Sequence, residues 1–313
     1  MTKLSRPDPK GRRLKENTRS LIKGCIRGEV IENEPLARHT SLKVGGPAEI
    51  FIIPADLVDL QTLLIALAET DIPWMVIGGG YNLLVRDGGY RGVVISLKDL
   101  ARLEQLAGDR IDAGAGVATG ELVRFAVERC LTGLEFLIGI PGTVGGALFM
   151  NAGAHGEAIL NRVESLATIR GGEVTVKRRA ELNYDYRRLS LAPGEIIISA
   201  TLQLSGGSTI EIEGRIESLL AHRRNAQRVG YPNAGSFFKN PEGKQAWRLI
   251  EEAGLKGYRV GGAQVAEEHS NFLVNRGGAR AADFIELAGI IKEKVKEHSG
   301  IILEEEVRIV GEP

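Results

Sequence analysis

The sequence predicts a protein of mixed helices and strands in three successive regions, because the residue pattern changes twice along the chain. Residues 49–77 alternate between strand and helix patterns, residues 92–204 carry mostly short alternating strands, and residues 210–298 carry helical patterns. The 313 residues are enough for two or three domains. The changes of pattern place boundaries near residues 78 and 207.

The first region is typical of a strand–helix–strand unit. Residues 49–55 predict a strand closed by Pro54, and residues 56–70 predict a helix with Asp56 as its N-cap. Residues 73–80 predict a short apolar strand that ends in glycines. Four leucines share one face of the helix, the face we expect in the core: Leu57, Leu60, Leu64 and Leu67.

The second region predicts a strand-rich domain with one helix. Thr119 is the expected N-cap of a helix that reaches residue 131, with Glu121 in its first turn. The residues Arg170-Gly171-Gly172 predict a hairpin turn between two strands. The predicted strands are residues 92–97, 110–116, 162–170, 173–177 and 195–204.

The third region predicts three helices followed by a strand. Residues 205–208, Ser-Gly-Gly-Ser, are typical of a linker that leads into it. The expected helices are amphipathic, and Gly254 closes the second of them. The helices are predicted at residues 210–227, 244–254 and 281–298, and the closing strand at residues 302–311.

Charge and composition exclude several classes of protein. Lys plus Arg and Asp plus Glu both total 40, so the chain lacks the basic balance typical of nucleic-acid-binding domains. No apolar run has membrane-spanning length, and residues 1–17 are expected to be a mobile basic arm without the apolar core of a signal peptide. Cys25 and Cys130 are expected to be reduced thiols. The histidines have no metal-ligand spacing: His39, His155, His222, His269 and His298.

The most informative segment is the glycine block at residues 133–156. It holds seven glycines and the single carboxylate of Glu135, with no Lys or Arg. Glycine at this density is tolerated where backbone turns sharply or approaches something closely. Two interpretations follow: main-chain N–H groups that hold a phosphorylated ligand, or a buried turn that packs a helix against a sheet.

Other glycine turns do not match the common nucleotide-binding motifs. Residues 78–84 follow a predicted strand but would need glycine in place of Leu83 to form a dinucleotide fingerprint. Residues 114–119 open a helix yet fail at the last glycine position. The chain contains no G-x-x-x-x-G-K-[ST] motif, which argues against a P-loop kinase or ATPase.

Three polar clusters are candidate binding or catalytic segments, and each also has a purely structural interpretation. Residues 235–241 (GSFFKNP) could orient a phosphorylated substrate or form a polar loop held by Pro241. Residues 184–188 (YDYRR) could hold a carboxylate through arginine or form a solvated surface. Residues 304–308 (EEEVR) alternate faces, and a buried member of that charge run would need a partner.

Taken in order, these segments and their neighbours resemble one family, the UDP-N-acetylenolpyruvylglucosamine reductases. The resemblance is to the shorter form of the family, without the extra tyrosine-bearing loop, and it covers the chain from about Leu21 to the end. The segments are HTSLKVGGPAE (39–49), GGGYNLLV (79–85), the whole glycine block, YDYR (184–187), AGSFFKNP (234–241), LIEEAGLKGYRVGGAQVAEEHSNFLVN (249–275) and LEEEVRIVG (303–311).

The resemblance implies an α+β flavoprotein with an FAD-binding fold of the vanillyl-alcohol-oxidase (PCMH) type in two lobes and a C-terminal α+β substrate-binding domain. It further implies non-covalent FAD, NADPH as reductant, UDP-N-acetylglucosamine enolpyruvate as substrate and UDP-N-acetylmuramate as product. The expected protein is a cytoplasmic monomer of peptidoglycan synthesis, with no metal, membrane or nucleic-acid partner. The expected segments are an arm (1–17), two FAD-binding lobes (18–78 and 79–207), a substrate domain (208–303) and a final strand (304–313).

The resemblance also assigns residues to the reaction. Arg187 is expected to bind the substrate carboxylate, Ser236 to protonate C2, and Glu306 to stand across the substrate from Ser236. Lys239, Asn240, Tyr186, Arg223 and Gln264 are expected to bind substrate. The expected cofactor-binding residues are Thr40, Val44, Gly45, Gly46, Gly78, Gly79, Gly80, Tyr81, Asn82, Leu83, Gly116, Pro141, Gly142, Thr143, Gly145, Gly146, Asn151, Ala152 and Gly153.

Two departures from the family pattern bear on these assignments. Tyr81 stands where the family usually has serine, and Leu189 stands where it usually has serine two positions after the motif arginine. Two other functions remain open. One is an FAD oxidase of the wider fold, which is not expected to match the Ser236 and Glu306 segments; the other is a non-catalytic nucleotide-sugar binding protein, which purified protein that stays colourless with FAD would indicate.

Overall fold

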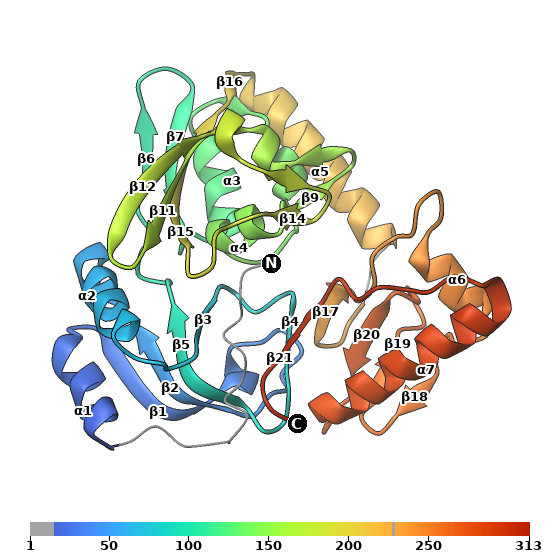
Figure 1. Ribbon diagram of the computed structural model, residues 1–313. Coiled ribbons are helices and arrows are strands. Elements are labelled where there is room, and N and C mark those ends of the chain that lie inside the picture. The colour runs from blue at the N-terminus through green and yellow to red at the C-terminus, as the bar shows by residue number, and fades with distance from the viewer. Residues whose placement is uncertain (1–15, 227–228) are drawn as a thin grey trace. The chain divides into compact units, whose positions relative to one another are not determined.

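A computed structural model describes the main chain of residues 16–226 and 229–313, and the side chains of residues 19–222 and 229–313 (Figure 1). The chain divides into two compact units. Unit 1 contains the described residues up to Glu32 together with Ile50–Gly79 and Gly92–His222. Unit 2 contains Asn33–Glu49, Gly80–Arg91 and the described residues from Arg223 to the C-terminus.

The first part of the chain forms a four-stranded sheet and two helices. The sheet has the order β1-β2-β5-β3, in which β3 and β5 run parallel. The helix predicted after Pro54 is confirmed, and Asp56 caps it by accepting the Asp59 N–H. The elements are α1 (Glu16–Cys25), β1 (Glu29–Pro35), β2 (Pro47–Ile53), α2 (Leu57–Ala68), β3 (Trp74–Ile77) and β5 (Tyr90–Ser96).

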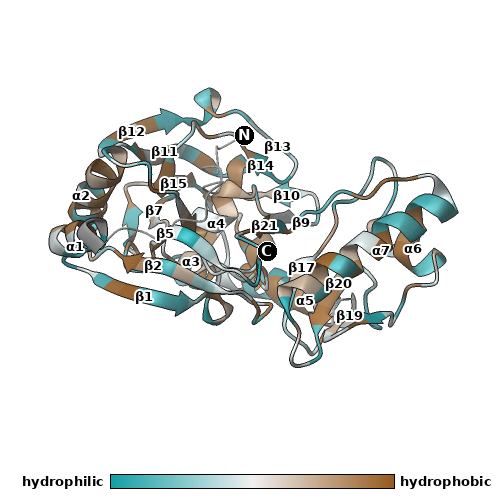
Figure 2. Cartoon of the chain, turned by 60° about the horizontal axis from the view of Figure 1, so that its bottom comes forward, coloured by the Kyte–Doolittle hydropathy of each residue, from teal (hydrophilic) through white to brown (hydrophobic). Residues whose placement is uncertain are grey.

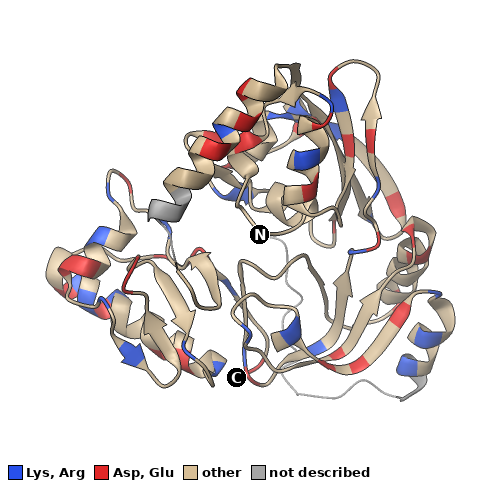
Figure 3. Ribbon diagram, turned by 180° about the vertical axis from the view of Figure 1, so that it is seen from behind, with Lys and Arg blue, Asp and Glu red and all other residues tan. Residues whose placement is uncertain are grey.

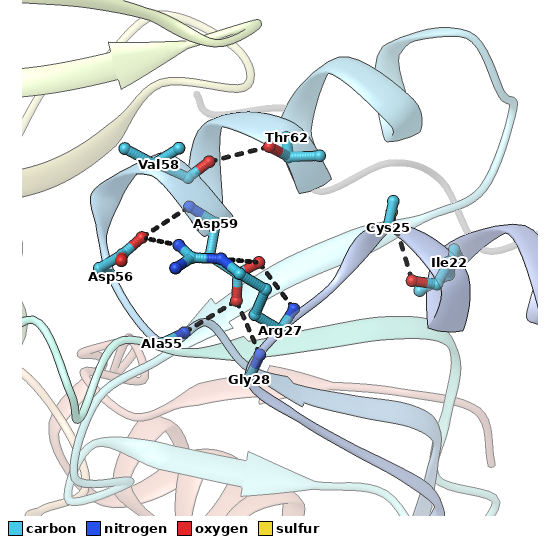
Figure 4. A network of polar contacts seen from close by, with 9 residues as sticks. All are labelled: Ile22, Cys25, Arg27, Gly28, Ala55, Asp56, Val58, Asp59 and Thr62. Carbon is cyan, nitrogen blue, oxygen red and sulfur yellow. Dashed lines mark hydrogen bonds and ion pairs between the residues drawn. The ribbon is translucent and has the colours of Figure 1, made fainter.

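A buried carboxylate joins the start of this region to α2. Asp59 is 1% exposed and accepts main-chain hydrogen bonds from Arg27, Gly28 and Ala55, each at 2.9 Å (Figure 4). Burial alone would raise the pKa of this carboxyl, but the three N–H donors and the Arg27 charge outweigh burial, so its pKa is lowered. Asp59 therefore carries its charge inside the unit at neutral pH.

A five-stranded antiparallel sheet, in the order β12-β11-β15-β7-β6, forms the rest of unit 1. The predicted Gly171-Gly172 turn joins β11 to β12, with both glycines at positive φ. The elements are β6 (Leu103–Leu106), β7 (Arg110–Gly114), α3 (Thr119–Val127), β8 (Leu131–Thr132), α4 (Val144–Phe149), β9 (Gly153–Ala154), β10 (Glu157–Ala158), β11 (Val163–Arg170), β12 (Glu173–Arg178), β13 (Tyr184–Asp185), β14 (Arg188–Leu189), β15 (Ile196–Gln203), β16 (Ser205–Gly206) and α5 (Thr209–Ala226).

Helix α5 carries charges of both signs along its length (Figure 3). Ile212 is its buried anchor, and Arg215 pairs with Glu135 at 3.2 Å. The segment predicted as a linker before this helix is not one: β16 pairs with β8, and Gly207 donates to the Cys130 carbonyl. A Ser-Gly segment can form a linker or a short strand, and pairing with β8 gives its main-chain groups hydrogen-bond partners.

Unit 2 is built around a second four-stranded sheet, in the order β17-β20-β19-β18. Its core includes Phe237, Phe238, Phe284 and Ile291, all at most 1% exposed, and hydrophobic residues alternate with polar ones along α7 (Figure 2). The elements are β4 (Leu83–Val85), β17 (Asn233–Ser236), α6 (Ala246–Glu252), β18 (Arg259–Val260), β19 (Ala263–Val265), β20 (Phe272–Asn275), α7 (Ala281–Ser299) and β21 (Arg308–Val310).

Two further sequence-based predictions are wrong in detail. Thr119 does not cap α3, because Ala118 is the cap residue and the Thr119 hydroxyl donates to the Ile140 carbonyl at 2.6 Å. The strand expected over residues 302–311 is shorter: β21 pairs in parallel with β4 only over Arg308–Val310. Residues 1–15 of the expected basic arm lie outside the described residues. Among the helices that are described, none is both long and apolar enough to cross a membrane.

Candidate active site

Ser236 lies at the end of β17, where the strand is irregular. Gly235 has φ +73°, and the pairing of β17 with β20 shifts between Asn233 and Ser236, which lies opposite Phe272. A β-bulge of this kind re-aims the side chain that follows it. The chain then turns inward at Phe237, which is 1% exposed. Glycine at position 235 therefore allows the half-buried Ser236 to sit beside a fixed core residue.

The Ser236 loop and the Glu306 segment are hydrogen-bonded to each other within unit 2. The Phe237 carbonyl accepts the N–H of Glu306 at 2.8 Å and that of Val307 at 3.3 Å. On the other side, the Asn82 side chain donates to the Glu306 carbonyl at 3.1 Å, and the Asn82 carbonyl accepts the Arg308 N–H at 3.1 Å. Two predicted catalytic residues and one predicted cofactor-binding residue are thus brought together.

The predicted substrate-binding residues of unit 2 have structural partners of their own. Lys239 Nζ lies 3.1 Å from Glu304 Oε2, and the Lys239 N–H donates to the Glu304 carbonyl. Asn240 Oδ1 accepts the Ala246 N–H at 3.0 Å and so holds the start of α6. Gln264 donates to the Gly257 carbonyl at 2.9 Å. The side chain of Arg223 lies outside the described residues.

The N-terminal loop of unit 2 contains several predicted cofactor-binding residues in tight backbone contact. Thr40 Oγ1 donates to the Val44 carbonyl at 2.8 Å, which closes the loop. A Cβ at Gly46 would lie 2.1 Å from the Asp87 carbonyl oxygen, and one at Gly80 would lie 1.9 Å from that of His39. A Cβ at Gly45 would meet the Val85 side chain at 2.9 Å. The packing of the loop itself therefore requires glycine at these positions. Of the neighbouring predicted cofactor-binding residues, Tyr81 is exposed and Leu83 is buried.

The glycine block of unit 1 shows which of its N–H groups remain available. Thr143 is the N-cap of α4, and its hydroxyl accepts the Gly146 N–H. The Val144 N–H donates to the Val117 carbonyl and the Gly145 N–H to the Ala115 carbonyl, at 2.8 and 2.9 Å. The N–H groups of Gly142 and Thr143 have no acceptor among the residues that the structure describes.

The same block lies against two other predicted cofactor-binding turns of unit 1. A Cβ at Gly78 would lie 2.6 Å from Thr143 Oγ1, and one at Gly145 would lie 2.8 Å from the Ala115 Cβ. A Cβ at Gly116 would lie 2.2 Å from the Leu97 carbonyl oxygen. Pro141 and Gly79 are exposed, whereas Ala152 and Gly153 lie at the end of the block, where β9 begins.

This arrangement fits a flat ligand with a polar edge. The partly exposed run Ile138 to Pro141 offers apolar surface, and the N–H groups of Gly142 and Thr143 follow it directly. Apolar walls with a few convergent polar groups are typical of cofactor sites. The N–H groups can donate hydrogen bonds to ligand oxygens without a charged side chain, so the residues present fit FAD.

Arg187 stands at the tip of the β13–β14 hairpin, in the left-handed conformation with φ +55°. Its guanidinium lies 5.0 Å from the ring centre of Tyr186, which is 55% exposed. Leu189, the departure from the family pattern, is 4% exposed and belongs to the core of unit 1. Leu189 therefore anchors the hairpin that presents Arg187.

Asn151 connects that hairpin to the glycine block. Its side chain donates to the Asp185 carbonyl at 3.0 Å and accepts the Leu160 N–H at 3.3 Å. The residue is 6% exposed and has φ +43°. Asn151 was expected among the cofactor-binding residues; in the structure its amide holds the segment that bears Arg187.

Glu135, the single carboxylate of the block, is a structural residue. Burial alone would raise its pKa, but hydrogen bonds from Thr132 Oγ1 at 2.6 Å and the Gly133 N–H at 2.7 Å, together with Arg215, leave the pKa lowered. Among the described residues, no cluster of three or more His, Cys, Asp or Glu side chains could hold a metal ion.

The sequence pattern did not single out Asn271, which is hydrogen-bonded to the Ser236 loop. Asn271 is 2% exposed, and its side chain bonds both main-chain groups of Phe238. It lies in the segment HSNFLVN, which carried the family resemblance, but a single asparagine in a polar turn has no distinguishing pattern. Its partner is 33 residues away along the chain.

Comparison with known proteins identifies the class first. Residues 48–176 match the family model of an FAD binding domain, so the chain is a flavoprotein. Residues 227–310 match a second model, UDP-N-acetylenolpyruvoylglucosamine reductase, C-terminal domain. The chain belongs to the UDP-N-acetylenolpyruvoylglucosamine reductase family, and it is an FAD-dependent oxidoreductase with an α+β fold.

Individual relatives match over nearly their whole length. The UDP-N-acetylenolpyruvoylglucosamine reductase of Geotalea uraniireducens is 63% identical over 95% of this chain and 99% of the relative. That of Heliobacterium modesticaldum is 46% identical over 92% of each. The crystal structure of the Thermus caldophilus reductase is 36% identical, with a TM-score of 0.78, and covers 91% of this chain and 99% of that one.

Proposed function

We propose that the chain catalyses the NADPH-dependent reduction of UDP-N-acetylglucosamine enolpyruvate to UDP-N-acetylmuramate, a step of bacterial peptidoglycan precursor synthesis in the cytoplasm. The observation that carries the proposal is the hydrogen bond between Phe237 and Glu306, which holds Ser236 and Glu306 in one small region of unit 2. A hydroxyl and a carboxylate fixed together suit a reaction that needs a proton donor beside a polarised substrate.

FAD, held non-covalently, would supply hydride transfer from NADPH to C3 of the enolpyruvyl group. Ser236 donates a proton to C2 from its hydroxyl. Glu306 stands across the substrate from Ser236 and either, when protonated, donates a hydrogen bond to the substrate carboxylate or polarises the enol ether. Arg187 binds that carboxylate through its planar guanidinium and stabilises the charge that develops as C2 becomes electron-rich.

The remaining assignments follow the same division. Gly142 and Thr143 offer their N–H groups to the cofactor phosphates, and the exposed Tyr81 covers the turn where relatives of the family usually carry serine. Lys239, Tyr186 and Gln264 contact the nucleotide sugar, with Lys239 exchanging its partner Glu304 for a phosphate oxygen. Arg223 and Asn240 complete the set. The protein acts as a monomer.

The test is an absorbance spectrum followed by an anaerobic NADPH titration. The purified protein should be yellow, denaturation should release all flavin into the supernatant, and NADPH should bleach the flavin absorbance. Adding the enolpyruvyl nucleotide sugar should restore the absorbance with formation of UDP-N-acetylmuramate. Flavin that stays reduced in the presence of this substrate would refute the proposal, and flavin retained in the precipitate would indicate a covalent oxidase.

A further inference from the structure

The side-chain amide of Asn271 hydrogen-bonds the main chain of the Ser236 loop, as the main chain of a neighbouring strand would. Its Oδ1 accepts the Phe238 N–H at 3.0 Å, and its Nδ2 donates to the Phe238 carbonyl at 2.8 Å. The Asn271 main-chain carbonyl accepts the Phe237 N–H at 2.8 Å. Three hydrogen bonds from one residue therefore hold two consecutive residues of the loop.

We propose that Asn271 is the positioning residue that sets Ser236 against Glu306, a role that rests on the proposed function. Phe237 is the link, because its N–H is held by Asn271 and its carbonyl accepts the Glu306 N–H. Ser236 precedes this residue directly. A shift of the Phe237 peptide moves the hydroxyl of Ser236 and the carboxylate of Glu306 in relation to each other.

An amide of this length is required at position 271. The Phe238 main chain presents one donor and one acceptor, and a single asparagine side chain satisfies both. Phe237 and Phe238 are each 1% exposed, so water has poor access to replace a missing partner. Aspartate keeps the acceptor and loses the donor, whereas alanine loses both.

His269 holds Asn271 in turn. Its Nδ1 accepts the Asn271 N–H at 3.3 Å, and its ring meets Phe272 edge-on with the ring centres 4.7 Å apart. Burial lowers the pKa of His269 more than its main-chain hydrogen bond raises it, which favours the neutral ring that can accept. Phe272 is the residue that lies opposite Ser236 in the sheet.

The experiment compares the two half-reactions by stopped flow in Asn271→Ala, Asn271→Asp and the control Val295→Ala. Val295 is fully buried in α7, within the same core, and its truncation lowers stability without removing a hydrogen bond from the loop. Flavin content, thermal midpoint and NADPH-driven flavin reduction should change alike in Asn271→Ala and Val295→Ala. Flavin reoxidation by the enolpyruvyl substrate should fall in Asn271→Ala alone, by roughly 10²-fold for a displacement of about 1 Å.

Asn271→Asp adds a readout that loss of stability would not give. Its carboxyl, when protonated, regains a donor for the Phe238 carbonyl, so the reoxidation rate relative to the parent protein should rise as the pH falls. Reoxidation in Asn271→Ala equal to that of Val295→Ala, or a flat pH ratio in Asn271→Asp, would overturn the inference while the proposed function stands. A parent protein that is not reoxidised by substrate would instead refute the proposed function.

Discussion

The main-chain N–H of Glu306 donates a 2.8 Å hydrogen bond to the carbonyl of Phe237, the residue that follows Ser236. The bond joins segments 69 positions apart in the sequence and makes one local structure of two predicted catalytic residues. Because this hydrogen bond joins main-chain groups, it fixes the backbone of the two segments from which the Ser236 and Glu306 side chains extend. Such pre-organisation is what a proton donor needs before substrate arrives.

The first prediction concerns the Ser236 hydroxyl. Ser236→Ala should retain FAD and be reduced by NADPH at nearly the parent rate, whereas reoxidation by substrate should slow by roughly 10²–10⁴-fold for loss of a general acid. Ser236→Cys should recover more of the rate than alanine, since a thiol can also donate a proton. Stopped-flow reoxidation measures both.

Ser270→Ala is the matched control, because the Ser270 hydroxyl is buried in the same unit and has no hydrogen-bond partner in the described part of the chain. Its removal should leave both half-reactions unchanged. Reoxidation of Ser236→Ala at the parent rate would remove Ser236 from the mechanism and leave it a loop residue.

Arg187→Lys should impair only the second half-reaction, by roughly 10²–10³-fold, if the guanidinium stabilises charge in the transition state. Lysine keeps the charge but lacks the planar guanidinium that can bind a carboxylate with two hydrogen bonds. Arginine and lysine would both adopt the same left-handed backbone conformation at position 187, with φ +55°. Arg188→Lys, on the exposed neighbour in β14, should behave like the parent protein. Equal slowing of flavin reduction and flavin reoxidation in Arg187→Lys would show that Arg187 supports structure instead.

A third prediction separates packing from cofactor binding at Gly145. Its N–H is already bonded to the Ala115 carbonyl, and a side chain there would meet the Ala115 Cβ at 2.8 Å. Gly145→Val should therefore destabilise the flavin-free protein, by about 1–3 kcal/mol as for other overpacked cores. Chemical unfolding of the apoprotein measures this, and an unchanged unfolding midpoint with weakened FAD binding would contradict it.

The sequence predicted regular elements well where the signal is local. The leucine face and the Asp56 cap of α2, and the Gly171-Gly172 turn, depend on neighbouring residues alone. The linker expected at residues 205–208 and the long strand expected at residues 302–311 failed, because strand formation depends on a partner elsewhere in the chain.

Prediction of the site residues is limited in the same way, because their roles depend on distant parts of the chain. Motif order makes Ser236 and Glu306 candidates, but nothing local distinguishes a glycine that faces a ligand from one that faces its own backbone, as Gly80 does against His39. Asn271 was missed for a related reason, since its role exists only through Phe237 and Phe238.

The last prediction follows from the buried charge of Asp59. Its folded-state pKa is lowered below the unfolded value of about 3.9, so the charge stabilises the fold above that pH and the stabilisation is lost as the pH falls through the lower, folded pKa. Asp59→Asn turns one acceptor oxygen into a donor that faces the N–H groups of Arg27, Gly28 and Ala55 (Figure 4). At pH 7 the variant should be less stable by about 1.5–3 kcal/mol, the range for hydrogen bonds to a charged group.

Urea unfolding of both proteins from pH 7 to pH 3 tests this, because the difference in unfolding free energy should shrink on the acid side. Asp71→Asn is the control, since Asp71 is exposed just after α2 and lies outside the network of Figure 4. A difference that stays constant across the pH range would mean that the shape of the Asp59 side chain, and not its charge, stabilises the start of α2.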